Sequence, residues 1–242
     1  MFALIVNEIV KLKRTLVLMV CVAAPLCAGA FPVMVMLNHL GPKPWVQMLG
    51  EGAAVWAYFL YPMAVTALTV LVAQIEHGPR MWNHLLALPV HRGALFAAKT
   101  IVVTGLVGLM TLILYGVLYG AVIAGAAFIP GASATGDPEW GDTFSSLFLL
   151  NGAGLCMIVI QLWVALRFRS FAVPLVLGIV GTFFALAIQA AKAAVFLPWL
   201  APAYAFTVTR PDSLAVVIFG YAGGVALLPV MLWHLSRHER VN

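Results

Sequence analysis

The sequence has little charge. Only 9% of its 242 residues are Asp, Glu, Lys or Arg, whereas an average soluble domain has about 25%. Hydrophobic residues make up 64% of the chain, and the mean hydropathy is +1.06. A water-soluble fold of this size needs more polar surface than these residues can supply. The composition therefore excludes a soluble globular protein and predicts an integral membrane protein.

Motifs for catalysis and nucleotide binding are also absent. The sequence contains no GxxxxGK[ST], HExxH or GxSxG motif and no glycine fingerprint for dinucleotides. Its three cysteines, Cys21, Cys27 and Cys156, have no metal-binding spacing. No Asp or Glu is expected deep in a membrane span, so an ion-driven carrier would have no carboxylate relay. We therefore expect a chain that is not an enzyme, binds no cofactor of its own and, if it transports, takes its energy from another subunit.

The apolar residues fall into six long runs. A helix needs roughly 20 apolar residues to cross the hydrocarbon, and the alternating strands of a membrane barrel are much shorter, with about ten residues each. We therefore predict an all-α integral membrane protein whose residues 1–242 form a single transmembrane domain. The predicted spans are 15–37, 52–75, 100–129, 144–166, 171–196 and 214–235.

The basic residues predict the orientation in the plasma (inner) membrane. Lys and Arg collect in cytoplasmic loops, and with the N-terminus inside, all but three of the 13 lie on the inner side. The exceptions are Lys43, Lys192 and Arg210. The acidic segment 131–142, which has no basic residue, then lies outside. Both termini are expected to be cytoplasmic.

The first 15 residues have the pattern of an amphipathic helix. Apolar side chains fall on one helical face and polar ones on the other, which predicts a helix lying in the cytoplasmic interface before the first span. The alternative is an inward continuation of that span. The charged residues assigned to this interfacial helix are Glu8, Lys11, Lys13 and Arg14.

The predicted outer connections are rich in Pro, Trp and Gly. Trp45, Trp140, Trp199 and Tyr204 are predicted to lie in the aromatic belt of the interface. The connection after the fifth span is apolar enough to dip back into the membrane. Near it, Gln189 and Lys192 either line a transport path or simply reach the interface.

Two glycine pairs predict close helix approach. They are Gly116-x-x-x-Gly120 in the third span and Gly220-x-x-x-Gly224 in the sixth.

The segment 74–99 is the most polar part of the chain. Pro79 suits the first turn of a helix and Pro89 ends it. Between them one side carries Met81, Trp82, Leu85, Leu86 and Leu88, and the other carries Arg80, Asn83 and His84. This pattern predicts a short cytoplasmic amphipathic helix, which either rests on the membrane or docks a soluble partner. The histidines at 77, 84 and 91, and at 234 and 238, are interpreted as ordinary interfacial and surface residues rather than metal ligands.

The sequence resembles an ABC-2 type permease, in particular the lantibiotic-immunity and bacitracin-resistance permeases. The resemblance rests on Glu8 with the basic run 11–15, on the segment 196–202, and on Glu76, Trp82, Leu85, Leu86, Leu88, Pro89, Arg92, Leu95 and Lys99. It implies that the helix after the second span is a coupling helix that docks on a separate P-loop ABC ATPase, which binds ATP and Mg²⁺. The residues assigned to this coupling are Glu76, Arg80, Trp82, Leu85, Leu86, Arg92 and Lys99.

The same resemblance implies a pair of permeases, as a homodimer or with a sister chain, that exports an antimicrobial peptide for immunity or resistance. Two other functions stay open on the sequence. The first is a non-transporting membrane scaffold or channel assembled through the glycine faces. The second is a CAAX-type intramembrane protease, because Glu76-x-x-x-Arg80 overlaps part of the EExxxR signature, although Ile75 stands where that signature has its first glutamate.

Overall fold

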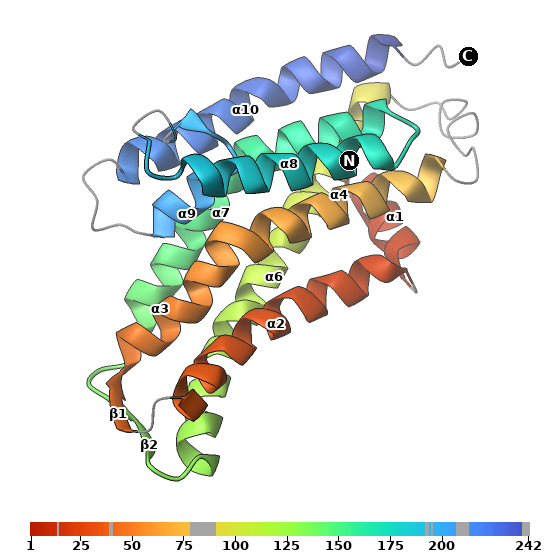
Figure 1. Ribbon diagram of the computed structural model, residues 1–242. Helices are drawn as coiled ribbons and strands as arrows, with labels where there is room; N and C mark the ends of the chain where they lie inside the picture. Colours follow the sequence, from red (N-terminus) through yellow and green to blue (C-terminus); the bar gives the residue numbers. More distant parts are fainter. Residues whose placement is uncertain are drawn as a thin grey trace.

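The computed structural model describes residues 1–13, 15–38, 41–77, 91–191, 194, 196–206 and 213–238 (Figure 1). The chain is a bundle of long helices with one small pair of strands. In chain order the elements are α1 (Phe2–Leu12), α2 (Leu16–Asn38), β1 (Gly41–Pro44), α3 (Trp45–Val55), the π-helix η1 (Trp56–Leu60), α4 (Tyr61–His77), α6 (Arg92–Phe128), β2 (Ala132–Thr135), α7 (Trp140–Arg167), α8 (Ala172–Ile188), α9 (Ala201–Phe206) and α10 (Ser213–His238).

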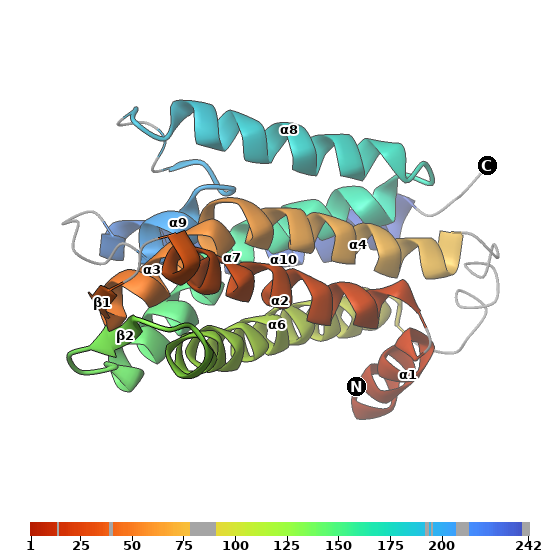
Figure 2. The same ribbon diagram turned by 60° about the horizontal axis from the view of Figure 1, so that its bottom comes forward.

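The helices confirm an all-α membrane protein. Among the described residues, five helices are long and apolar enough to cross a membrane, namely Leu16–Asn38, Trp45–His77, Arg92–Phe128, Trp140–Arg167 and Leu214–Arg237. The predicted fifth span corresponds to α8, which has 17 residues and ends at Ile188 rather than at 196. That length is at the short end of what can cross the hydrocarbon. Figure 2 shows α8 at one edge of the bundle, packed on α4 and α7.

The strands join two connections that are far apart in the sequence. β1 pairs with β2 in parallel, from Gly41 opposite Ala132 to Pro44 opposite Thr135. The sequence analysis did not predict these strands. The pair closes the end of the bundle that the basic residues assign to the outside (Figure 1).

One of the two glycine pairs makes a close helix contact. A Cβ on Gly220 would collide with the backbone of Ala153, and one on Gly224 with Leu155 and the backbone of Cys156. Small residues therefore let α10 approach α7, as the pattern predicts. Gly116 and Gly120 differ, because nothing described lies within 4 Å of a Cβ at either position.

The aromatic residues after α8 correct a prediction. Trp199 and Tyr204 are each only 7% exposed, so within the bundle they are core residues rather than members of an interfacial belt. They belong to the segment around α9, which packs against α7 and α10 (Figure 2). The Tyr204 hydroxyl donates a hydrogen bond to the Gln189 carbonyl over 2.7 Å, which ties this segment to the end of α8. By contrast Trp140 is 47% exposed, as the belt prediction expects.

Candidate functional site

Four charged side chains meet at the end of the bundle that carries α1. Lys11 Nζ lies 2.6 Å from Glu8 Oε1 and 3.1 Å from Glu76 Oε1. Lys99 Nζ lies 2.5 Å from Glu8 Oε2 and 2.9 Å from Glu76 Oε1. Each lysine therefore bridges both glutamates, and we call this closed arrangement the charge ring.

The ring joins three elements that local structure alone would not hold together. Glu8 and Lys11 are one turn apart on α1, Glu76 is in the last turn of α4, and Lys99 is near the start of α6. Figure 2 shows α1 lying across the ends of the longer helices at this point. Since α1 also packs on α6, the ring fixes the position of α1 against the bundle.

The ring is buried and its charges balance. Glu76 is 1% exposed, Lys99 3% and Glu8 8%. Isolated charges in such surroundings would be very costly, so opposite charges must pair and form hydrogen bonds. Two carboxylates against two ammonium groups give no net charge. The arrangement is what permits four ionised groups at the edge of an apolar bundle.

The ring also shifts the pKa values of the two residues from α1. Burial alone would raise the pKa of Glu8, but the charge of Lys99 and hydrogen bonds from Lys11 and Lys99 outweigh it and hold this pKa below its usual value. Burial alone would lower the pKa of Lys11, but the hydrogen bond that Lys11 donates to Glu8 and the charges of Glu76 and Glu8 raise it above its usual value. Both groups therefore stay ionised over a wider pH range than they would in water.

One oxygen of the ring has no partner among the described residues. Glu76 Oε2 is buried and accepts no hydrogen bond there, while Oε1 accepts from both lysines. Glu76 is also the last buried residue before segment 78–90, which connects α4 to α6 and lies outside the described residues. The ring thus sits at the root of the segment for which the sequence predicts a coupling helix.

The structure brings together four of the predicted site residues. Glu8 and Lys11 were assigned to an interfacial helix and Glu76 and Lys99 to ATPase coupling, and all four are in the ring. Lys13 and Arg92 are exposed near it. Gln189 is exposed at the end of α8. The predictions for Arg14, Arg80, Trp82, Leu85, Leu86 and Lys192 fall on positions outside the described residues.

Two details of the sequence analysis need correction. Glu8 is buried against α4 and α6, a contact that the prediction of an interfacial helix did not include, while the apolar Phe2, Val6 and Ile9 are exposed, as a face turned toward lipid would be. Glu76 and Lys99 were expected to flank a docking surface, but they are buried and bind the α1 residues. Glu76 and Lys99 lie within α4 and α6 and not in the loop that the sequence predicts, so their pairing with α1 was not foreseen. The available signal was that charges of opposite sign occur at the edges of three apolar runs, where each needs a partner.

His77 and His234 have structural contacts. His77 Nε2 lies 3.2 Å from the Ala165 carbonyl oxygen, and Trp163 Nε1 donates to His234 Nδ1 over 3.1 Å. Both histidines therefore pack against α7. Among the described residues no group of three or more His, Cys, Asp or Glu side chains could hold a metal ion.

The chain matches a known family over three quarters of its length. The family model described as "ABC-2 family transporter protein" matches residues 4–185. The chain belongs to the ABC-2 family of transporters. No curated protein and no solved structure matches it.

Membership of the ABC-2 family fixes the broad role. The chain is the permease of a transporter, and the family implies association with an ABC ATPase. The match extends from α1 into α8, so it includes all four residues of the charge ring. With its apolar helices, this ABC-2 permease is a multi-pass membrane protein.

Proposed function

We propose that this permease works as an exporter that expels an amphiphilic antimicrobial peptide, of the lantibiotic or bacitracin kind, for immunity or resistance. A pair of permeases, identical or sister chains, would work with two ATPase subunits that bind ATP and Mg²⁺. Segment 78–90 would dock on the ATPase through Trp82, Leu85 and Leu86, since buried aromatic and aliphatic anchors provide most of the binding energy at such interfaces.

The charge ring is the observation that carries this mechanism. Glu76 is fixed to Lys99 on the far side of segment 78–90 and to Lys11 on α1. If the ATPase displaced this segment, α4, α6 and α1 would therefore move together, whereas without the ring only one helix end would bend. Arg92 is exposed at the start of α6, which supports a direct contact with the ATPase.

Co-purification tests the docking step. The permease, extracted in mild detergent with the ABC ATPase encoded beside it, is expected to retain that ATPase. Trp82→Ala or Leu86→Asp should abolish retention, while the matched control Asn83→Ala, on the predicted polar side of the same helix, should not. If all three variants retain the ATPase equally, segment 78–90 is not the docking element.

The isosteric change Glu76→Gln separates docking from coupling. It leaves Lys99 and Lys11 without one of their two carboxylates but does not touch the predicted anchors. We expect the ATPase to remain bound while ATP-driven export falls. Unchanged export would show that the ring has only a structural role.

A sensitivity panel tests the cargo. Cells without the gene should become more sensitive to cationic peptide antibiotics, and the wild-type gene but not Leu86→Asp should restore resistance. If no peptide antibiotic in the panel shows a change in sensitivity, the proposal of a peptide cargo is wrong, but the role as a permease is unaffected.

The two alternatives make different predictions. A scaffold or channel should be indifferent to changes in 78–90 and should act without ATP. A CAAX-type protease would need Glu76 to contact water or substrate, yet Glu76 is 1% exposed and its Oε1 already accepts hydrogen bonds from two ammonium groups. The ring therefore supports the transporter over the protease.

A further inference from the structure

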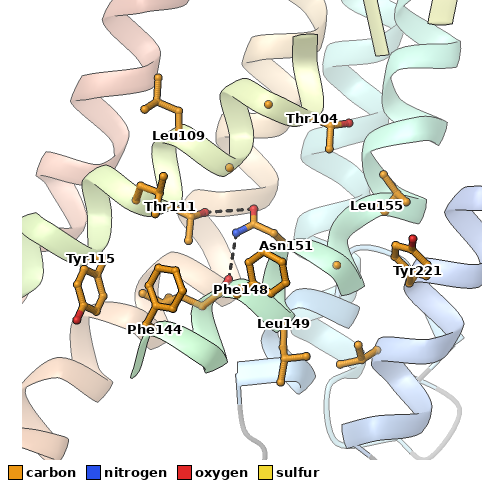
Figure 3. A pocket seen from close by; sticks show the side chains of 16 residues that line it. Thr104, Leu109, Thr111, Tyr115, Phe144, Phe148, Leu149, Asn151, Leu155 and Tyr221 are labelled. Carbon is orange, nitrogen blue, oxygen red and sulfur yellow. Dashed lines mark hydrogen bonds between the residues drawn. The ribbon is translucent and has the colours of Figure 1, made fainter. Parts of the chain in front are cut away.

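A large cleft lies between α6, α7 and α10, away from the charge ring. Its volume is about 840 Å³, and Figure 3 shows side chains from all three helices around it. Exposed apolar residues line it, among them Leu109, Leu112 and Phe148. Since these helices span the membrane, the cleft opens to lipid rather than to water.

The floor of the cleft has two polar side chains, and both already form hydrogen bonds within the protein. Thr111 Oγ1 lies 3.2 Å from Asn151 Oδ1, and Asn151 Nδ2 donates to the Leu147 carbonyl over 3.0 Å (Figure 3). These groups bind one another and the backbone, so the floor carries no charge. The part of a ligand that enters here is therefore apolar.

The length of the cleft matches one leaflet. On α6 its lining runs from Thr104 to Tyr115, which is about 16 Å at a rise of 1.5 Å per residue. The hydrocarbon core is about 30 Å thick, so the cleft covers about half of it. It lies in the half nearer β1 and β2, because Tyr115 reaches the first residue of α7.

Aromatic residues lie at one end of the cleft, where Tyr115 and Phe144 line it and Trp140 lies beside them. The Tyr115 hydroxyl donates to the Trp140 carbonyl, and the Tyr115 ring contacts Phe144 at a centroid distance of 5.7 Å. Trp140 stacks on Tyr119 at 3.9 Å and remains half exposed. Faces of Trp and Tyr attract cations.

The chain that precedes Phe144, next to this end of the cleft, is acidic. Asp137, Glu139 and Asp142 are exposed immediately around Trp140, and the segment from 131 to 142 has no basic residue. The four ion pairs of the described residues do not include any of the three. An anionic headgroup would be repelled here, whereas a cationic group would be attracted.

We propose that the cleft between α6, α7 and α10 binds a cationic amphiphile from the leaflet that contacts the β1–β2 end, with its apolar part against Thr111 and Asn151 and its positive group at Trp140 and Asp142. The ligand of this site would be the substrate class of the exporter, and that part of the inference rests on the proposed function. Lipid is as apolar as the cleft, so preference for this ligand comes from packing and charge.

Photolabelling of the purified full-length chain in dodecyl maltoside tests the site without any ATPase. The probes are dodecyltrimethylammonium and dodecanol, each with a diazirine on its chain, and labelled residues are identified by mass spectrometry. We expect labelling of α6 and α7, with half-saturation by the ammonium probe at a concentration about two- to fivefold lower than by the alcohol. This difference should shrink as salt is added.

Variants separate the charge from the cavity. The triple change Asp137→Asn, Glu139→Gln and Asp142→Asn should remove the preference for the ammonium probe, and Asp142→Asn alone should reduce it. Gly108→Leu places a side chain in the open cleft, where nothing lies within 4 Å of its Cβ, and should lower labelling by both probes several-fold. Gly116→Leu, equally open but outside the lining, is the matched control and should leave labelling unchanged.

The outcomes distinguish this inference from the proposed function. Equal binding of the two probes would contradict the preference for a cationic ligand and would show that the cleft binds any lipid chain. If labelling is unchanged in Gly108→Leu, the probes do not bind in the cleft and the proposal is wrong. If the probes behave as expected but cells show no ATP-driven peptide resistance, the binding site stands and the proposed cargo fails.

Discussion

At the residue scale, the charge ring accounts for charges that are otherwise out of place in so apolar a chain. Each of its four members has two partners of opposite charge, so removing one leaves a surplus charge in buried surroundings. Removal of one partner from a buried ion pair typically costs about 3–5 kcal/mol, because the remaining charge stays desolvated. Single changes in the ring should therefore have larger effects than their position near the membrane surface suggests.

Lys99→Met tests this cost. The change removes the most buried ammonium group and leaves Glu8 and Glu76 with Lys11 alone. We expect the free energy of unfolding to fall by about 3–5 kcal/mol, seen as a lower Tm in detergent. Lys13→Met, the same substitution at an exposed lysine, should leave Tm unchanged, and equal effects of the two variants would contradict the ring's contribution to stability.

The shifted pKa values predict how stability depends on pH. The pKa of Glu8 is below its ordinary value of 4.5, so its contribution is complete above that value and is lost as the pH falls through the lowered pKa. The pKa of Lys11 is above its ordinary value of 10.5, so its contribution is complete below that value and is lost as the pH rises through the raised pKa. Glu8 and Lys11 should therefore cause no change in Tm between these limits, measured in detergent, and a loss at the acidic and alkaline ends. A step near neutral pH would show that another group controls stability.

At the element scale, two glycine pairs with the same spacing behave differently, and only one of them packs α10 closely against α7. Gly220 and Gly224 lie against the backbone of α7, where no side chain fits, while Gly116 and Gly120 face open space. The same spacing thus serves close packing in one helix and makes no contact with the described residues in the other. Sequence spacing alone cannot distinguish the two, since the outcome depends on which face the neighbouring helix covers.

The same substitution should therefore have opposite effects at Gly220 and Gly116. Gly220→Ala drives a methyl group into the Ala153 backbone and should destabilise the protein by about 1–3 kcal/mol. Gly116→Ala meets no atom and should be neutral or stabilise its helix by about 0.5–1 kcal/mol. Thermal unfolding of the two variants in detergent measures both, and a loss of stability at Gly116 would indicate a contact that the single chain does not contain.

The elements also show how far the sequence could predict the fold and the site. Long apolar runs predicted the helices because the hydrocarbon leaves few other solutions for the backbone. The charge ring, the β1–β2 pair and the burial of Trp199 were missed, because each depends on contacts between segments that are distant in the sequence. Helix ends were also misjudged: α4 continues to His77 and α6 begins at Arg92, so Glu76 and Lys99 lie within helices instead of in a loop.

At the scale of the whole molecule, two chemically different ends follow from the fold. One end has the charge ring, α1 and the exposed bases Lys13, Arg92 and Arg237, and the other has the strand pair and the acidic segment from 131 to 142. This polarity agrees with the positive-inside rule, under which the first end is cytoplasmic. Both proposals depend on it, since an ATPase can reach only the cytoplasmic end and the acidic segment beside the cleft must then face outward.

Cysteine labelling can determine that orientation. In a variant without Cys21, Cys27 and Cys156, we expect Asp137→Cys to react with a membrane-impermeant maleimide on intact cells. Lys13→Cys and Arg237→Cys, exposed at the opposite end of the bundle, should react only after permeabilisation, because both termini are predicted to be inside. Labelling of Lys13→Cys on intact cells would show that the orientation in the membrane is the reverse of the predicted one. Segment 78–90 would then face away from any cytoplasmic ATPase, so this one result would remove the coupling mechanism while leaving the charge ring and its stability unaffected.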